Sequence, residues 1–81
     1  MNSDLSGQRL FVGIKQATKA VKTGKAVKAY VANGVEMKMR NTFVKLCKLN
    51  GVSLEVVKSA DELGAMCGIE VAASVAVVTA N

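Results

Sequence analysis

Residues 28–57, KAYVANGVEMKMRNTFVKLCKLNGVSLEVV, contain the strand–helix–strand unit that decides the fold. Lys28 to Ala32 predicts a largely buried strand, and Val52 to Val57 predicts a second strand rich in β-formers. The apolar residues between them recur at i, i+4, i+7 and i+8, which is the spacing of one helix face. They are Met39, Phe43, Leu46 and Cys47. Met37 to Leu49 is therefore expected to form the longest helix.

Two shorter elements precede this unit. Leu10 to Val12 is a brief apolar run and predicts a short strand. Lys15 to Thr23 predicts a helix, because its alanine and valine residues recur at helical spacing. Lys15, Lys19 and Lys22 lie at i, i+4 and i+7, so they are expected to share one solvent-facing side of that helix.

The rest of the chain adds one helix and one strand. Ser59 is expected to begin a short helix up to Cys67 with a capping box, in which its hydroxyl accepts from the Glu62 amide and the Glu62 side chain reaches back. Ala73 to Thr79 is rich in β-branched residues and predicts a strand buried on both faces. This alternation implies an α/β domain with helices on both faces of a small central sheet. We expect residues 1–81 to form a single domain.

The charge of the chain is concentrated in its first third. Eleven lysines and arginines against six acids give a net charge of +5. Residues 5–35 hold six bases and no acid, whereas residues 36–81 hold five of each and cancel. Lysines that served only solubility would be scattered more evenly, so the pattern favours a polyanionic partner.

The composition excludes several kinds of site. The chain has no histidine, which excludes a serine–histidine triad and histidine metal ligands. Its two cysteines cannot build a four-thiolate zinc site. Cys47 is expected to be buried as a small hydrophobe, and Cys67 to be partly exposed. We therefore expect no enzyme, no catalytic residue, no metal and no cofactor.

The chain shows no sign of a membrane or export segment. Residues 1–7 are polar and do not resemble a signal peptide. The longest nearly apolar run, Val71 to Val78, is too short to span a bilayer. We expect a cytoplasmic protein with no membrane partner.

The sequence GIKQATK, residues 13–19, is the first candidate for ligand binding. A glycine turn leads into a helix whose first amides have no intrahelical acceptor and can receive an anion. Lys15 and Lys19 can contact phosphate, and the Gln16 side chain can read a base edge. The residues alone fit an ordinary strand–helix corner with solvated lysines at least as well.

The sequence LGAMCGIEV, residues 63–71, is the second candidate. Its two glycines let the backbone of this chain approach a partner closely. On a loop, Ile69 and Val71 can pack against an unstacked base. The alternative is a helix end whose apolar residues enter the core, and the residues alone favour this alternative.

Together the two motifs resemble those of the ribosomal protein L-seven-Ae family of kink-turn RNA-binding proteins, most closely its short bacterial members. The first motif, GIKQATKA at residues 13–20, has the bacterial Lys–Gln form, and the second is LGAMCGIEVAA at residues 63–73. The resemblance covers nearly the whole chain, and the second motif is highly specific. It implies a three-layer α–β–α sandwich around a four-stranded mixed β-sheet.

The resemblance also implies a site for RNA that bends sharply at tandem sheared G·A pairs beside a bulge. Gly13, Lys15 and Gln16 would contact the guanine edges of those pairs. Lys19 would hold backbone phosphate, and the loop 69–71 would pack on an extruded nucleotide. The residues implied as RNA-binding are Gly13, Ile14, Lys15, Gln16, Lys19, Lys22, Ile69, Glu70, Val71 and Ala72. Lys28 would extend the basic rim beside Lys22.

We therefore expect an RNA-binding protein that recognises kink-turns and stabilises the kinked conformer by population shift. The RNA would be ribosomal RNA or another non-coding or messenger RNA. The protein would be a monomer, with the ribosome as a candidate location. The alternative function is a protein-interaction domain of the same fold, whose basic face binds an acidic protein.

Overall fold

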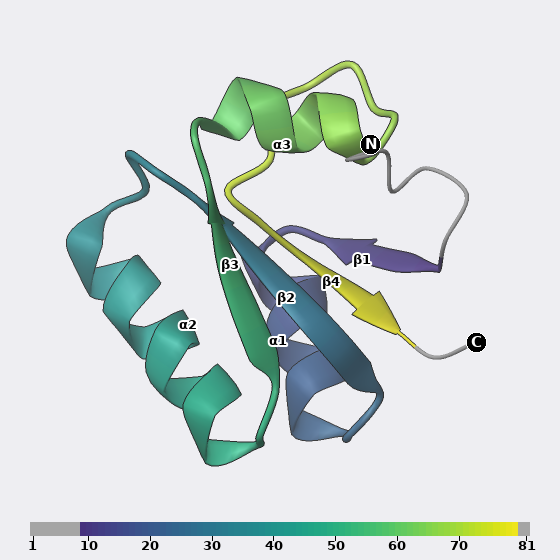
Figure 1. The fold of residues 1–81 in the computed structure, drawn as a ribbon, viewed down its shortest axis with the longest axis vertical. Helices are drawn as coiled ribbons and strands as arrows, with labels where there is room; N and C mark the ends of the chain where they lie inside the picture. The colour runs from purple at the N-terminus through teal and green to yellow at the C-terminus, as the bar shows by residue number, and fades with distance from the viewer. Residues whose placement is uncertain (1–8, 80–81) are drawn as a thin grey trace.

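The computed structural model describes residues 9–79, which form four strands and three helices that alternate along the chain (Figure 1). They are β1 (Leu10–Val12), α1 (Ile14–Lys22), β2 (Ala26–Ala32), α2 (Met37–Leu49), β3 (Ser53–Val57), α3 (Ala60–Met66) and β4 (Val75–Thr79). The predicted alternation is confirmed, and the boundaries differ from the predicted ones by at most two residues. The polar start of the chain lies outside the described residues. Within residues 9–79, no helix has the length and apolarity needed to cross a membrane.

The four strands form one mixed sheet in the order β1-β4-β2-β3. β2 and β3 are parallel, and β4 runs antiparallel to both β1 and β2. α2 connects the two parallel strands. Such a crossover is needed because the end of β2 and the start of β3 lie at opposite ends of the sheet. The carboxyl ends of β1, β2 and β3 therefore meet the amino end of β4 at one edge of the sheet. We call this edge, with the turns that follow residues 12, 32 and 57 and the segment 67–74, the loop edge.

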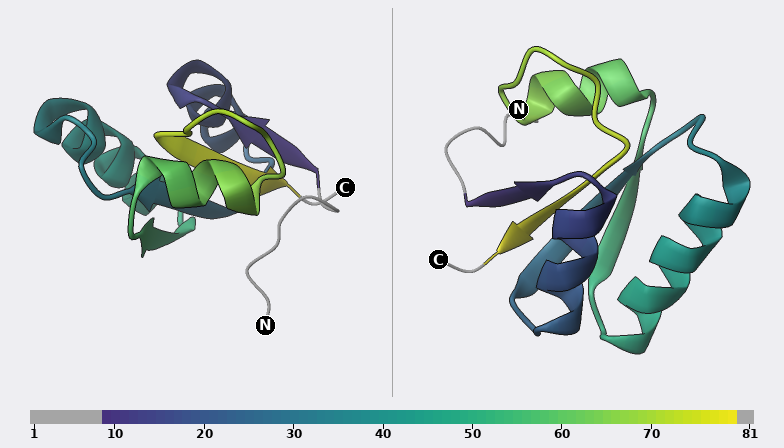
Figure 2. Two further views of the ribbon diagram at one scale, coloured as in Figure 1. Left: turned by 90° about the horizontal axis from the view of Figure 1, so that it is seen from above. Right: turned by 180° about the vertical axis from the view of Figure 1, so that it is seen from behind.

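Helices cover both faces of the sheet, so the predicted three-layer sandwich is confirmed (Figure 2). α1 and α2 lie on one face and α3 lies on the other. Alternate residues of the central strands pack on opposite sides: Val31 and Val77 contact the α1–α2 layer, whereas Tyr30 and Ala76 pack beneath α3. All five residues of β4 are buried, as expected for a strand covered on both faces.

The two helices on the first face pack differently against the sheet. α1 buries the small residues Ala17, Ala20 and Val21, which allow its backbone to approach the strands closely. α2 buries only Phe43 and Cys47. The other two members of its predicted apolar stripe, Met39 and Leu46, are only partly buried.

α3 begins at the predicted cap. The Glu62 amide donates to Ser59 Oγ at 3.1 Å, and the reverse bond from the Ser59 amide to the Glu62 carboxylate is absent from the described part of the chain. The expectation that Cys67 is partly exposed is wrong. Cys67 is 6% exposed because it packs with Leu63 in the core beneath α3. Burial raises the pKa of both the Cys47 and the Cys67 thiol, so neither is a reactive thiolate at neutral pH.

Candidate nucleic-acid interface

The first motif begins with a sharp turn at Gly13, between β1 and α1. Gly13 has φ 97° and ψ 155°, a region that side chains disfavour and that glycine adopts without strain. Its amide donates to the Val75 carbonyl at 2.9 Å, and its carbonyl accepts the first helical bond from Ala17 at 2.9 Å. The start of α1 is therefore attached directly to the start of β4.

The first turn of α1 presents the partial positive charge of a helix start. The amides of residues 14–16 precede the first helical hydrogen bond, and α1 has neither a side-chain cap nor an acid in its first turn. The partial positive charge at a helix start favours anions. Lys15, Gln16 and Lys19 are exposed, and they add donors and cations to this end.

The lysines of α1 are all exposed, as predicted. Residues 9–79 contain a single ion pair, which joins Lys28 Nζ to Glu55 Oε1 at 2.9 Å, so no lysine of α1 is paired within this part of the chain. The bond to Glu55 raises the pKa of Lys28. Lys28 also lies 5.4 Å from the centre of the Tyr30 ring, whose side chain faces α3. Lys28 is therefore paired on the α3 side of the sheet, whereas α1 lies on the other face, and its place in the basic rim stays a prediction.

The second motif forms the end of α3 and the loop that returns to β4. The loop folds back along its own helix, because the Ile69 amide donates to the Gly64 carbonyl at 3.1 Å and the Ala73 amide donates to the Ala60 carbonyl at 3.0 Å. Gly64 is buried beneath this loop. A Cβ atom at Gly64 would overlap the Val71 carbonyl oxygen and lie 3.3 Å from the Ala72 Cα. The glycine of this helix thus sets the position of the loop backbone.

The apolar residues of the loop lie on the surface. Ile69 is 36% exposed and Val71 is 68% exposed, and Glu70 and Ala72 are exposed as well. The alternative in which these residues enter the core is therefore wrong. Because the loop backbone packs on α3, the loop presents apolar side chains to solvent without loosening the core.

The structure brings the two motifs to the same loop edge. β4 pairs with β1 through Val12 and Ala76, so the loop before β4 ends beside the turn at Gly13 (Figures 1 and 2). Lys15 and Gln16 lie in the first turn of α1 next to this edge, and Lys19 lies one turn further along.

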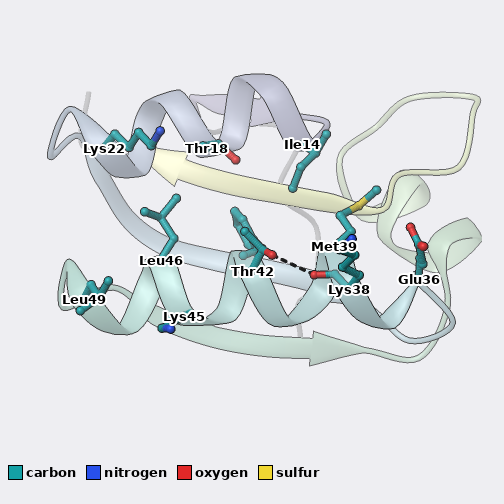
Figure 3. Close-up of a pocket in the computed structure, with 11 residues that line it drawn as sticks. Ile14, Thr18, Lys22, Glu36, Lys38, Met39, Thr42, Lys45, Leu46 and Leu49 are labelled. Atoms are coloured by element: carbon teal, nitrogen blue, oxygen red, sulfur yellow. Dashed lines mark hydrogen bonds between the residues drawn. The ribbon is translucent and has the colours of Figure 1, made fainter.

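Two predicted side chains do not belong to this edge, Lys22 because of its position and Ile14 because of its direction. Lys22 is the last residue of α1, about 10 Å along the helix axis from Lys15. The Ile14 side chain points toward α2 and lines a groove between α1 and α2 (Figure 3), and Lys22 also lines it. Both side chains therefore line the groove between the two helices.

The turn after β2 also lies beside the second motif, and no sequence pattern was interpreted as placing it there. The Ala32 amide donates to the Ser74 carbonyl at 2.8 Å, which places this turn beside the second motif. Arg40 Nη1 donates to Asn33 Oδ1 at 3.5 Å and brings a further cation to the loop edge. An available signal was the Asn-Gly pair that directly follows a predicted strand, with bases in the helix beyond it.

The groups at the loop edge are of kinds that can contact nucleic acid. Residues 9–79 contain no group of three metal-ligating side chains. The edge combines unpaired helix amides, exposed lysines, a side-chain amide and exposed apolar residues. Lysines and amides bind phosphate, a side-chain amide can read a base edge, and apolar residues can contact an unstacked base.

Comparison with known proteins assigns the chain to a family. Residues 3–81 match the model of the ribosomal protein L7Ae/L30e/S12e/Gadd45 family. A protein named RNA-binding protein from Bacillus pumilus is 38% identical over 72 residues, which are 88% of each chain. A second protein with that description, from Caldanaerobacter subterraneus subsp. tengcongensis, is 35% identical over 65 residues, 80% of this chain and 79% of its own.

A solved structure has the same fold. A protein of unknown function from Bacillus halodurans superposes with a TM-score of 0.80 at 21% identity, covering 88% of this chain and 71% of its own. At this identity the likeness concerns the fold alone. The family match covers nearly the whole chain and names the same family that the two motifs resemble. This chain therefore belongs to the ribosomal protein L7Ae/L30e/S12e/Gadd45 family.

Proposed function

We propose that this protein binds structured RNA and selects the kink-turn, a duplex that bends sharply beside a bulge and tandem sheared G·A pairs. The observation that carries the proposal is that both motifs lie at the loop edge, where the Gly13 amide donates to the carbonyl of Val75, two residues beyond the second motif. The name RNA-binding protein that both relatives carry supports RNA as the ligand. The proposal also places the protein in the cytoplasm as a monomer, on ribosomal RNA or another non-coding or messenger RNA.

The start of α1 would recognise the bent base pairs. Gly13 has no side chain, so a base edge can approach the backbone closely. Lys15 and Gln16 are exposed beside it and would donate to guanine edges, whose O6 and N7 atoms accept hydrogen bonds. Lys19 would contact phosphate one turn further along the helix.

The loop of residues 69–72 would hold the opposite side of the bend. Its exposed side chains, Ile69 and Val71, would pack on a nucleotide that the bulge extrudes. An open duplex would offer no such nucleotide. The protein would therefore bind the kinked conformer more tightly and shift the RNA equilibrium toward it.

A titration with matched RNAs tests the proposal. A short kink-turn RNA is compared with a control in which Watson–Crick pairs replace the G·A pairs, at near-physiological salt, and both affinity and bending are followed by fluorescence. We expect about tenfold or greater preference for the intact kink-turn, together with bending on binding. Equal and weak binding of both RNAs, lost as salt rises, would contradict shape selection and leave only non-specific lysine contacts.

Replacement of Lys19 by alanine is expected to weaken kink-turn binding about fivefold at 0.15 M salt, because one phosphate contact contributes a salt exponent of about 0.9. The slope of log affinity against log salt concentration should decrease in magnitude by about one, which corresponds to one fewer counterion released. Lys48→Ala provides the control, since Lys48 is exposed in the last turn of α2 and lies outside both motifs. An unchanged salt slope in Lys19→Ala would remove Lys19 from the phosphate-binding residues.

A further inference from the structure

A groove of about 540 Å³ runs between α1 and α2, on the face of the sheet that α3 does not cover (Figure 3). Its walls are apolar side chains from both helices: Ile14 comes from α1, and Met39, Leu46 and Leu49 come from α2. Phe43, which is 1% exposed, also lines it from α2. The sheet covers only part of the predicted apolar stripe of α2. The uncovered part, Met39 and Leu46, faces this groove.

α2 has more apolar residues than it buries against the sheet. Of its thirteen residues, α2 buries only Phe43 and Cys47, whereas Leu49 at its end is 77% exposed. Single exposed apolar residues are ordinary in a soluble domain. A continuous apolar groove between two helices is typical of a surface that binds a partner.

The rim of the groove is positively charged. Lys22, Lys38 and Lys45 line it, against the single acid Glu36. None of these four residues forms an ion pair with another residue of the range 9–79, where only Lys28 and Glu55 are paired. A partner with carboxylates beside its apolar residues would match this rim, and a cationic partner would be repelled.

Charge and shape favour one kind of occupant. A second copy of the chain would bring the same basic rim and a further net charge of +5. Single-stranded nucleic acid binds best to exposed aromatic faces, and the only aromatic ring of the groove, that of Phe43, is buried. An acidic amphipathic protein segment carries apolar side chains for the apolar walls and carboxylates for the basic rim.

We propose that the groove binds an amphipathic helical segment of a partner protein, with apolar residues on the buried face and aspartate or glutamate along its flanks. The groove-lining residues extend from Glu36, the N-cap of α2, to Leu49 at its end, about 20 Å along the helix axis. This length accommodates about three to four turns of a partner helix, with apolar anchors at i, i+3, i+4 and i+7. The inference rests on the lining and charge of the groove and not on RNA binding, although Ile14 and Lys22 belong to both residue sets.

The probe for this test is a fluorescent synthetic peptide of about 14 residues, with leucines at the anchor positions and glutamates elsewhere. It is compared with a peptide in which lysine replaces every glutamate, and with one in which serine replaces every leucine. The full chain is titrated with each peptide by fluorescence anisotropy, and the contacted residues are mapped from NMR amide signals. We expect the acidic amphipathic peptide to bind about tenfold or more tightly than either control and to shift the signals of Leu46 and Leu49.

A matched pair of charge reversals locates the site. Lys45 lines the groove, whereas Lys48 lies in the same helix end and does not line it, and both side chains are exposed. Lys45→Glu is expected to weaken peptide binding about tenfold, and Lys48→Glu less than about twofold. Leu49→Ser should weaken binding without loss of folding, because Leu49 is 77% exposed.

Each of the other outcomes would overturn the proposal. Equal binding of the lysine peptide, or equal effects of the two charge reversals, would show that the groove does not select an acidic helix. Self-association of the chain that shifts the Leu46 signal would identify a second copy as the occupant. Shifts at Leu46 on addition of kink-turn RNA would identify RNA instead. Kink-turn RNA is titrated separately into Lys45→Glu, so that failure of peptide binding is distinguished from failure of RNA binding.

Discussion

Replacement of Lys15 by glutamate is expected to weaken binding of kink-turn RNA by about 100-fold or more. Loss of a lysine contact to a guanine edge costs about 1–3 kcal/mol, and the new carboxylate adds repulsion next to the phosphates. Lys15 is exposed and lies in the first turn of α1, which contains no acid. A glutamate there would interact favourably with the helix dipole, so the protein should remain folded. Affinity is measured at fixed salt, and stability by thermal unfolding.

The control for Lys15→Glu is Lys48→Glu, which makes the same change of charge in the last turn of α2. It should lower RNA affinity only through the net charge, by less than about threefold. If the two variants weaken binding equally, the protein binds RNA through its overall charge and not through the start of α1. The comparison therefore separates a specific contact from general attraction.

Replacement of Gly64 by alanine is expected to lower the free energy of unfolding by about 1–3 kcal/mol, the cost of overpacking a close contact. In an unconstrained helix the same change would raise stability by about 1 kcal/mol, so the sign of the effect is diagnostic. The new Cβ atom would meet the Val71 carbonyl and the Ala72 Cα. The loop that begins at Gly68 would have to move away from α3. Urea unfolding followed by circular dichroism measures the change.

The same variant is expected to weaken kink-turn binding by about tenfold, because contacts to an unstacked base are worth about 1–3 kcal/mol. Gly24→Ala is the control. Gly24 has φ +77° but open space where a Cβ atom would lie, so this variant should lose about 1–2 kcal/mol of stability through backbone strain and keep its RNA affinity. A Gly64→Ala variant as stable as the parent would show that the loop does not depend on close contact with α3.

The elements of the fold could be predicted because each depends on neighbours in the chain. The spacing of Phe43 and Cys47 identifies a helix side that faces a core, and Ser59 with Glu62 identifies a helix start. The loop of residues 69–71 was predicted in the same way, from the resemblance of the sequence LGAMCGIEV to a family motif. Its backbone position depends on the contact between Gly64 and Val71, which lie seven residues apart.

Burial depends on which element covers a residue, and local patterns do not contain that information. Cys67 ends a helix before a glycine, a position that suggests exposure, yet it is buried because the sheet lies beneath it. Ile69 and Val71 are apolar, yet they are exposed because the loop backbone itself occupies the surface of α3. The apolar stripe of α2 was correctly predicted, whereas its division between core and groove depends on the distance between α1 and α2.

The sequence by itself determined the order of helices and strands, the concentration of positive charge in residues 5–35 and the two motifs. The tertiary structure alone decided that the two motifs lie at the same edge of the sheet. They are separated by about fifty residues, and they meet because β4 enters the sheet between β1 and β2 and pairs with both. Strand order depends on backbone hydrogen bonds between distant segments, and these bonds are the same for every side chain. The sequence pattern therefore predicts that the strands exist, and only their packing shows which residues become neighbours.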